Sequence, residues 1–333
     1  MFNFVRNKNL AISHRMKFRL LAILFVLFGA MTALAQKPLE PAHSGDERLP
    51  EYLHLLQGKR VGVLANHNSF VEDRHLVDTL LSAGVDVELI FAPEDGFRAE
   101  GVVRQRDTYM GIEVLNLTRS PKANDVFRCD VVVCDLCDTG VRTSHTLRAL
   151  VRLMGVCANI GVPLVVLDRP NPLGRCTDGA VVEPQYRTSE DMLPLPLLHG
   201  MTLGELARMA NGEGWLTEGA KCPLTVVPYV ESTDETPFPT IDPIFSVGLA
   251  ENVPIVVENC EGAVTLLTVV ENYANRSEEQ EFFLGEEFDR QMGVSYVREM
   301  IELGYTAEDI ESMWSGDVEG FATQREEYLI YEN

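Results

Sequence analysis

The stretch CDVVVCDLCD (residues 129–138) contains a run of three valines and ends in an aspartate. The same design recurs in VDVELIFAP (85–93), which leads into Glu94, and in VPLVVLD (162–168), which ends in Asp168. Nearly continuous aliphatic and β-branched runs, without alternating polar residues, are typical of strands buried on both faces of a parallel sheet. We therefore predict three central parallel strands, each ending in or followed by an acid.

Helical segments separate these strands and indicate an α/β fold. DRHLVDTLLSAG (73–84) and TSHTLRALVRLMGVCANIG (143–161) have apolar residues at helical spacing and end in glycine, which stops a helix. GKRVGVLANHNS (58–69) supplies a first strand before them. Strands that alternate with amphipathic helices predict βαβ units, and hence a Rossmann-like parallel sheet covered by helices on both faces.

The chain is long enough for two modest domains. We predict a Rossmann-like domain over residues 51–230 and a smaller, truncated α/β domain over residues 231–333, because the Pro-rich acidic segment ESTDETPFPTIDP (231–243) resembles a boundary. The further elements predicted from the pattern are a helix over 201–216, a strand over 222–230 and helices over 286–304 and 306–331.

The N-terminus has the composition of a secretory signal peptide. Residues 1–19 carry five basic and no acidic residues, and residues 20–35 are uncharged and end in Ala-Leu-Ala. The alternative, an uncleaved anchor, needs an apolar run of about 20 residues. We predict that residues 1–35 are cleaved near Ala35 and that residues 36–50 form a linker. The chain is then periplasmic or secreted, with no stable membrane anchor after cleavage.

The net negative charge of the chain limits the kinds of ligand and macromolecule that it can bind. The chain carries 50 acidic and 28 basic residues, a net charge of −22, and the predicted cleavage removes basic residues only. A strongly acidic protein is repelled by nucleic acid and by anionic lipid. We therefore expect no nucleic-acid partner, and a ligand that is neutral, weakly charged or received by a local basic pocket.

Motifs for nucleotides, metals and serine nucleophiles are missing from the sequence. No G-x-G-x-x-G follows the first strand, and neither a G-x-x-x-x-G-K-[ST] loop nor a G-x-S-x-G elbow occurs. The C-x-x-C pair Cys134 and Cys137 lies inside a strand-like run, so we interpret it as small buried side chains. We interpret His75 and His145 as helix-surface residues. We expect no cofactor and no metal.

Polar residues gather at the predicted strand ends. The carboxyl ends of parallel strands meet at one edge of a sheet, and ligands bind in the crevice outside that edge. The alternative is that loops begin there and favour Asp and Asn for their turns. The residues at the strand ends are Asn66, His67, Glu94, Asp138 and Asp168, with Arg98 and Arg142 a few residues beyond two of them.

Carboxylates in a cleft are the apparatus of glycoside hydrolysis, in which one group protonates the leaving oxygen and another acts as base or nucleophile. Glu94 is flanked by the apolar residues Pro93 and Phe97. Apolar surroundings raise the pKa of a carboxyl group, as a general acid requires. We therefore expect Glu94 to have a raised pKa and to act as the general acid.

Five motifs carry a resemblance to a known family: PEDGFR (93–98), CDTGVR (137–142), LDRPNP (167–172), VVEPQYRT (181–188) and LLHGMTLGELA (197–207). In their order and approximate spacing they resemble the NamZ-type exo-β-N-acetylmuramidases. The resemblance implies a secreted or periplasmic glycoside hydrolase that removes terminal N-acetylmuramic acid from peptidoglycan fragments. It also implies a Rossmann-like domain followed by a smaller one, and muramyl saccharides or muropeptides as partners.

The resemblance also implies roles for particular residues. Glu94 matches the family's best candidate for the catalytic carboxylate, and Asp138 and Asp168 are the further catalytic candidates. The residues implied in substrate binding are Asn66, His67, Arg98, Arg142, Arg169, Asn171, Glu183 and His199.

The sequence departs from the family pattern in three places. Asp95 stands where the family has His, Thr143-Ser144-His145 replaces aromatic residues, and the region between Pro239 and Glu286 is shorter than usual. An alternative function is therefore that of a catalytically inactive paralogue that binds peptidoglycan fragments or a partner protein.

Overall fold

The structure is a computed structural model. Its described residues all belong to one compact unit. The predicted signal peptide, Asp95 and Arg98 lie outside the described residues. Only the backbone is described for 104–106, 245–246 and 254–257. The described residues are 43–94, 96–97, 104–107, 110–187, 193–230, 245–246, 254–257, 264–277 and 281–331.

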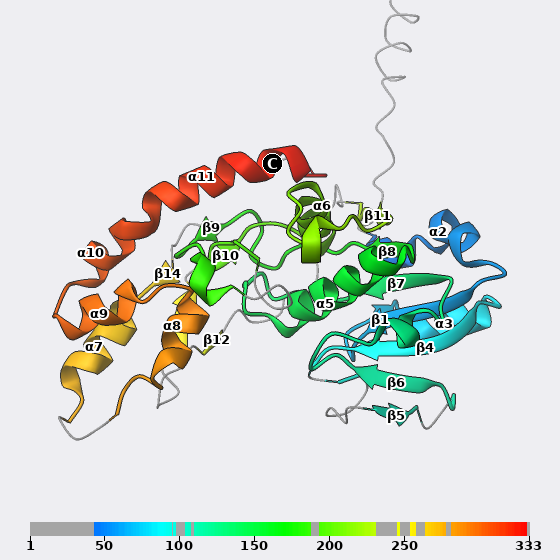
Figure 1. The fold of residues 1–333 in the computed structure, drawn as a ribbon, viewed down its shortest axis with the longest axis horizontal. Helices are drawn as coiled ribbons and strands as arrows, with labels where there is room; N and C mark the ends of the chain where they lie inside the picture. The colour runs from blue at the N-terminus through cyan, green and yellow to red at the C-terminus, as the bar shows by residue number, and fades with distance from the viewer. Residues whose placement is uncertain are drawn as a thin grey trace, which may run out of the picture. The chain divides into compact units, whose positions relative to one another are not determined.

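A seven-stranded sheet forms the centre, in the order β11-β8-β7-β1-β4-β6-β5 (Figure 1). All neighbouring strands pair in parallel except β5, which is antiparallel to β6. The predicted parallel α/β sheet is therefore confirmed. The strands are β1 (Arg60–Ala65), β4 (Asp86–Ala92), β5 (Arg104–Arg106), β6 (Glu113–Asn116), β7 (Val131–Asp135), β8 (Leu164–Leu167) and β11 (Leu224–Val227).

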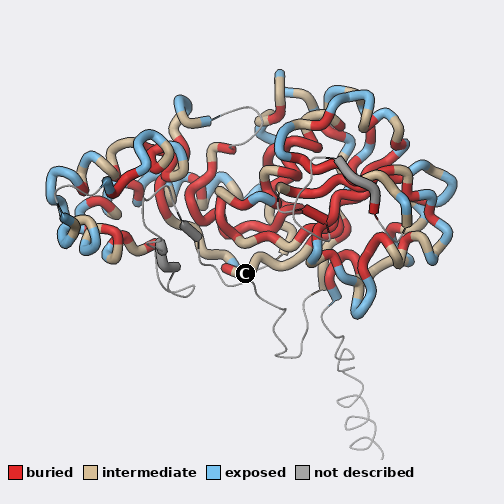
Figure 2. The backbone as a smooth tube through the Cα atoms, turned by 90° about the horizontal axis from the view of Figure 1, so that it is seen from below, coloured by how far each residue is buried: buried red, intermediate tan, exposed pale blue. Residues whose placement is uncertain are grey.

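Helices cover both faces of this sheet, as its unbroken apolar strands require. The sheet-covering helices are α2 (Leu49–Leu56) and α3 (Leu76–Ser82) on one face, and α4 (Ala123–Val126), α5 (His145–Ile160) and α6 (Leu203–Gly212) on the other. Along β7, Val132 and Cys134 face α5, while Val131 and Val133 face α2 and α3. Figure 2 shows that buried positions concentrate in these layers.

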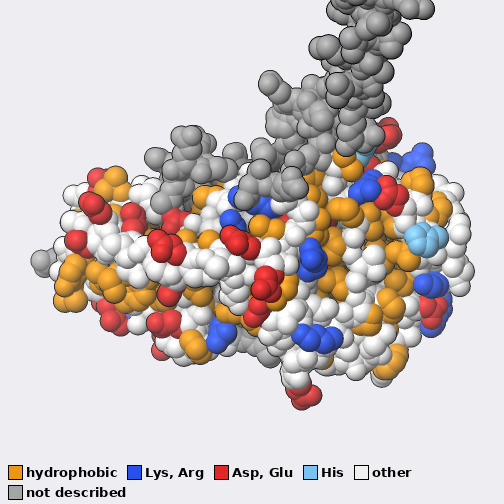
Figure 3. Space-filling view, turned by 90° about the horizontal axis from the view of Figure 1, so that it is seen from above, with side chains coloured by type: hydrophobic (Ala, Val, Ile, Leu, Met, Phe, Trp, Pro, Cys, Tyr) orange, Lys and Arg blue, Asp and Glu red, His pale blue; other side chains and the backbone are white. Residues whose placement is uncertain are grey.

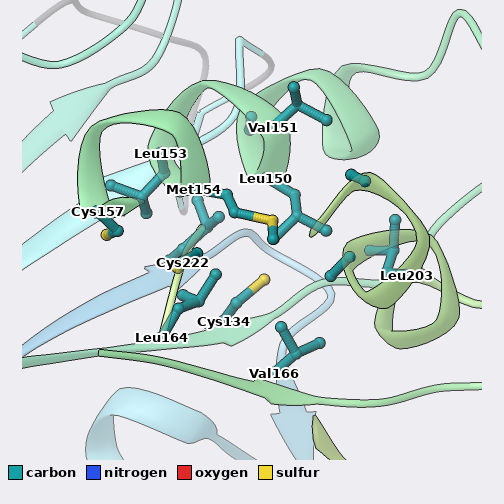
Figure 4. Packing of buried hydrophobic residues seen from close by; sticks show 14 of the residues in the cluster. Cys134, Leu150, Val151, Leu153, Met154, Cys157, Leu164, Val166, Leu203 and Cys222 are labelled. Carbon is teal, nitrogen blue, oxygen red and sulfur yellow. The ribbon is translucent and has the colours of Figure 1, made fainter. Parts of the chain in front are cut away.

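The layer between α5 and the sheet is built from aliphatic and sulfur-containing side chains. Leu150, Met154 and Cys157 of α5 point toward Cys134 and Leu164 of the sheet (Figure 4). The interpretation of Cys134 as a small buried side chain is thus confirmed. Cys137, the second cysteine of the C-x-x-C motif, is partly exposed. Within the described residues, no group of three or more His, Cys, Asp or Glu could hold a metal ion.

The order in which the strands are connected reverses direction at β1, which is therefore the topological switch point of the sheet. The chain leaves β1 for β4 on one side and later returns to β7 on the other. The crevice at such a reversal, outside the carboxyl ends of the strands, is where open α/β sheets bind ligands. The loops that follow β1, β4 and β7 therefore bound the expected site.

A second hydrophobic core lies beyond this edge. It packs Phe288, Val297 and Trp314 from the last third of the chain against Val141 and Leu197. The predicted domain boundary at residue 230 stays a prediction, because the second core uses residues from both sides of it. The helices of this part are α7 (Leu267–Asn275), α8 (Glu286–Met292), α9 (Tyr296–Glu302), α10 (Ala307–Glu311) and α11 (Ser315–Arg325).

Short elements complete the fold. The paired short strands are β2 (Phe70–Val71) with β3 (Arg74–His75), β9 (Thr177–Asp178) with β10 (Leu198–His199), and β12 (Phe245–Ser246), β13 (Pro254–Val257) and β14 (Val264–Thr265). The 3₁₀ turns are η1 (Gly45–Glu47), η2 (Pro184–Tyr186), η3 (Thr217–Gly219), η4 (Ser312–Trp314) and η5 (Glu326–Tyr328). Within the described residues, no helix has both the length and the apolar character of a membrane span.

Candidate active site

Glu94 lies in the turn that follows β4, at the carboxyl edge of the sheet. Asn116, at the end of neighbouring β6, fixes this turn, because its Nδ2 donates to the carbonyl of Pro93 at 2.7 Å and to that of Glu94 at 3.3 Å. Gly96 N–H closes the turn on the Pro93 carbonyl at 2.9 Å. The Glu94 side chain is 25% exposed, so it is held by the protein yet reachable from solvent.

Three basic side chains of α5 surround the Glu94 carboxylate. Arg152 Nη1 donates to Oε1 at 2.8 Å, His145 Nδ1 lies 2.9 Å from Oε2, and Arg148 Nε lies 3.9 Å from Oε1. Arg152 is itself almost buried and also donates to the Leu117 carbonyl at 2.6 Å. Residues spaced by three, four and seven positions share one face of a helix, so α5 presents these three groups together.

This environment lowers the pKa of Glu94 below its usual value. Burial is the largest single influence and raises the pKa, but the charges of Arg148, Arg152 and His145 and the hydrogen bond from Arg152 together outweigh it. The expectation that apolar neighbours raise the pKa of Glu94 is therefore wrong. The residues next to Glu94 in the sequence did not indicate this, because the three compensating groups come from a helix about fifty residues further on.

Arg148 also connects the site to the second core. Its charge contributes to lowering the pKa of Glu287 on α8, although the hydrogen bond from Arg290 is the largest cause of that shift. A second carboxylate, contributed by α8, therefore lies within electrostatic range of the cations around Glu94. The sequence patterns did not single out Glu287.

Asp138 is buried and organises the start of α5. Its carboxylate accepts from Ser144 Oγ at 2.5 Å, Thr146 Oγ1 at 2.7 Å and Gly140 N–H at 3.1 Å, and His199 Nε2 lies 3.3 Å away. Burial pushes the pKa of Asp138 upward, but the contacts with His199, Ser144 and Thr146 lower it overall. The structure thus brings Asp138 and His199 together and links them to Glu94 through the first turn of α5.

Asp168 is fully buried at the end of β8. It accepts from Thr202 Oγ1 at 2.6 Å, the Gly204 N–H at 2.8 Å and the Tyr331 hydroxyl at 2.7 Å. Burial raises the pKa of Asp168 to about 6. These side-chain hydrogen bonds connect Asp168 to the start of α6 and to the C-terminal segment.

The neighbouring Arg169 is also engaged within the protein. It binds the buried Asp135 through Nε at 2.6 Å and Nη2 at 3.1 Å, and its Nη2 lies 3.0 Å from the buried Asp46. Asp46 and Asp135 were not predicted, although Asp135 is part of the same acidic strand end as Asp138. One guanidinium therefore contacts two buried acidic side chains.

Arg142 and Asn171 bind backbone groups. The buried guanidinium of Arg142 donates to the carbonyls of Ala180 and Leu195 at 2.7 Å, and to those of Gln291 and Met292 at 2.8 and 2.9 Å. Burial lowers the pKa of Arg142 to about 9. Asn171 donates to the Met201 carbonyl at 2.9 Å and accepts from the Leu173 N–H at 2.8 Å. Both side chains fix loops in place.

The remaining predicted residues lie at the rim or outside the described residues. Asn66 is buried and folds its own loop, since its Oδ1 accepts from the Asn68 N–H at 3.0 Å. His67 is exposed, and Glu183 is half-buried and accepts from Gln185. Arg98 lies outside the described residues.

The interpretation as a helix-surface residue is wrong for His75 and is confirmed for His145, which lies exposed on α5. His75 is buried, its Nδ1 accepts from the Val77 N–H at 3.3 Å, and its Nε2 lies 2.9 Å from the Asn66 carbonyl. His145 is 53% exposed but contacts Glu94. A usable signal existed, because basic residues at positions 145, 148 and 152 of one predicted helix form a stripe on one face.

The chain has an open, doubly wound α/β sheet with a carboxylate outside its strand ends, the architecture in which ligands generally bind at the switch point. Two family models match the chain: exo-beta-N-acetylmuramidase NamZ, N-terminal, over residues 61–246, and exo-beta-N-acetylmuramidase NamZ, C-terminal, over residues 255–331. The chain therefore belongs to the NamZ exo-β-N-acetylmuramidase family.

Individual relatives agree with this assignment. The chain is 30% identical, over 208 residues, to the peptidoglycan beta-N-acetylmuramidase NamZ of Bacillus subtilis (strain 168). That match covers 56% of this chain and 50% of the relative, so the chain spans about half the length of that relative.

Solved structures resemble the whole described fold. A DUF1343 family protein from Bacteroides fragilis NCTC 9343 superposes with a TM-score of 0.75 at 29% identity, covering 88% of this chain and 100% of that one. A second DUF1343 family protein from the same organism gives a TM-score of 0.74 at 23% identity, covering 87% and 99%, which supports the fold alone.

Proposed function

We propose that this chain is an exo-acting glycoside hydrolase that removes terminal N-acetylmuramic acid from peptidoglycan fragments, with Glu94 at the centre of its site. The observation that carries the proposal is the held, partly exposed Glu94 carboxylate at the switch-point edge, in a chain of the NamZ family. The Bacillus subtilis relative is a peptidoglycan beta-N-acetylmuramidase, and that activity is the one proposed for this chain.

The site suits an anionic sugar in an acidic protein. N-acetylmuramic acid carries a carboxylate of its own, so a chain with a net charge of −22 needs local cations to receive it. Arg148 and the half-exposed His145 lie beside Glu94. On the face shown in Figure 3, basic side chains are scattered among acidic ones, which does not favour a nucleic-acid partner.

The role of Glu94 follows from its charge. A general acid must carry a proton near its working pH, whereas the lowered pKa leaves the Glu94 carboxyl ionised. We therefore propose that Glu94 acts as an ionised carboxylate that orients and stabilises positive charge. The role of general acid then belongs to another group of the site.

The test is hydrolysis of a chromogenic β-N-acetylmuramide by wild type and by Glu94→Gln. We expect Glu94→Gln to lower kcat/KM by about 10²–10⁴-fold, the usual range for removing a charged catalytic partner. Glu51→Gln is the matched control, because Glu51 is 52% exposed on α2, on the other face of the sheet. Equal turnover by wild type and Glu94→Gln would overturn the proposal.

A second function is the binding of muramyl fragments without turnover. The positions of the other two predicted catalytic acids, Asp138 and Asp168, favour it. Asp138 and Asp168 are both buried and saturated with protein donors. They are therefore poorly placed to act as a second catalytic carboxylate. Muropeptide binding measured by calorimetry, together with absent turnover in wild type, would select this function.

We also propose that the chain works outside the cytoplasm, as a periplasmic or secreted protein. The basic, then apolar, then Ala-Leu-Ala pattern of residues 1–35 supports this location. N-terminal sequencing of the protein recovered from the producing cell tests it, and a mature N-terminus at Gln36 is the expected result. An intact N-terminus in the cytoplasmic fraction would contradict it.

A further inference from the structure

The Nδ1 atom of His145 lies close to two side chains, one of which can only accept a hydrogen bond and the other only donate one. Its Nδ1 lies 2.9 Å from Glu94 Oε2 and 3.2 Å from Arg148 Nη2. A carboxylate only accepts hydrogen bonds and a guanidinium only donates them, whereas an imidazole nitrogen does one or the other. Only one of the two contacts can therefore be a hydrogen bond at a time.

The carboxylate contact is the stronger of the two. Both contacts involve one charged group, and the contact with the carboxylate is shorter, 2.9 Å against 3.2 Å. Arg148 has other acceptors, since its Nη2 also donates to the Thr143 carbonyl at 3.3 Å and its Nε faces Glu94 Oε1 at 3.9 Å. We conclude that Nδ1 carries a proton and donates it to Glu94.

The other ring nitrogen, Nε2, is then the atom that can gain or lose a proton during a reaction. The His145 side chain is 53% exposed, and none of the described residues hydrogen-bonds Nε2. A carboxylate that fixes one ring nitrogen while the other faces the substrate is the arrangement by which hydrolases move protons. Glu94 and Arg148 are the charged groups that contact the ring. Arg152 binds the same Glu94 carboxylate, and Glu287 of α8 lies within electrostatic range of Arg148.

We propose that His145 is the general acid of this site, with Glu94 holding its Nδ1–H and Nε2–H delivering a proton to the leaving group. The proposal rests on the proposed function and names the residue that carries its proton. It also fits an ionised Glu94, which cannot donate a proton itself. Neither the family resemblance nor the strand-end pattern pointed to His145.

The proposed step balances as follows. The bond between the anomeric carbon and the glycosidic oxygen breaks, its electron pair stays on that oxygen, and the oxygen takes the Nε2 proton. Water adds to the anomeric carbon and releases one proton to solvent. The exposed Nε2 is then reprotonated from solvent, so the enzyme returns to its starting state with one glycosidic bond hydrolysed.

The first test uses the acidity of the leaving group. A general acid matters when the leaving group is a sugar hydroxyl and matters little when it is 2,4-dinitrophenolate, which departs without a proton. We expect His145→Gln to lower kcat about 10²–10⁴-fold on a muramyl disaccharide and less than about tenfold on the dinitrophenyl β-N-acetylmuramide. Equal losses on both substrates would overturn the proposal, because a merely structural role does not distinguish leaving groups.

Two further variants sharpen this result. His145→Ala opens room for an added acid, so imidazolium from an imidazole buffer should restore part of the disaccharide turnover, whereas Glu94→Gln should gain nothing from it. His54→Gln is the matched control, since His54 is an exposed histidine on α2. We expect it to match wild type on both substrates. Absence of rescue in His145→Ala would count against proton transfer by this ring.

A measurement independent of turnover tests the pairing itself. Nitrogen-15 NMR of labelled histidine distinguishes the two neutral tautomers. We expect the His145 signal to show Nδ1–H in wild type and to lose that preference in Glu94→Gln. Nε2–H as the dominant neutral tautomer in wild type would overturn the proposal whatever the activity. If the tautomer is as expected but neither substrate is hydrolysed, both the proposed function and the proton-transfer role fail.

Discussion

Glu94 and Asp46 are both carboxylates near the carboxyl edge of the same sheet, yet their surroundings shift their pKa values in opposite directions. Glu94 has three basic neighbours on α5, which lower its pKa. Asp46 is fully buried, and its pKa rises to about 7, first because of burial and then because of the nearby charge of Asp135. Arg169 lies 3.0 Å from the Asp46 carboxyl and lowers its pKa, but burial and the charge of Asp135 outweigh this effect.

The raised pKa of Asp46 makes a prediction about stability. The folded state holds this proton more tightly than the unfolded chain, so the carboxyl favours folding below about pH 4 and that contribution is lost as the pH rises toward 7. Asp46→Asn cannot ionise. We expect it to be more stable than wild type by about 1–3 kcal/mol at pH 8, with the difference shrinking by pH 5. Urea unfolding of both proteins at each pH measures this, and a difference that does not change with pH would refute it.

The α5 helix shows how far an element could be predicted from its sequence. Its bounds and apolar face follow from the spacing of residues 143–161, and its glycine stop at Gly161 is confirmed by a left-handed φ of 73°. Its buried face packs on the sheet as predicted. Its polar face could not be assigned, because only the packing of the helix decides that residues 145, 148 and 152 meet the turn after β4.

Other elements departed from prediction for local reasons. β5 and β6 were not predicted, since Arg104-Gln105-Arg106 and Glu113-Val114-Leu115-Asn116 are short and lack a continuous apolar run. The predicted helix over 286–304 is divided into α8 and α9 at Gly293, which has a φ of 78°. A Cβ at Gly293 would lie 3.0 Å from Val182 and 3.1 Å from Arg142, so a side chain there would be crowded as well as strained.

The N-terminus of α5 gives the second stability prediction. Ser144 caps the helix by accepting from the Leu147 N–H at 3.0 Å, and it also donates to the buried Asp138. We expect Ser144→Ala to lower the free energy of unfolding by about 1–2 kcal/mol and to reduce turnover by displacing His145. Thermal unfolding and muramide hydrolysis are the measurements. Thr143→Ala is the control, and an equal effect of the two changes would contradict the capping role.

At the scale of the whole molecule, long-range contacts hold the two cores together. Arg142 binds the last carbonyls of α8, and Tyr331 reaches Asp168 across 163 residues of sequence. Tyr331 also stacks on Tyr229, with ring centroids 3.9 Å apart. These contacts could not be predicted, because the sequence marks Asp168 and Arg142 as polar residues near strand ends and is silent on what they meet.

Removal of the Tyr331 hydroxyl tests the contact between Tyr331 and Asp168, which we call the clasp. We expect Tyr331→Phe to lower the free energy of unfolding by about 1.5–3 kcal/mol, because the buried Asp168 loses a donor. Tyr328→Phe is the matched control: its hydroxyl donates to the exposed Glu213, so its effect should stay within about 0.5 kcal/mol. Chemical denaturation of the three proteins at pH 8 makes the comparison. Equal stabilities of the Tyr331 and Tyr328 variants would show that the clasp contributes nothing.

The clasp between Tyr331 and Asp168 also has a consequence for synthesis. Asp168 stays without the Tyr331 donor, and Arg142 without the carbonyls of α8, until nearly the whole chain has left the ribosome. Contacts between residues so distant in sequence form late and slow the final collapse. We therefore expect the last steps of folding to wait until the C-terminal segment is available.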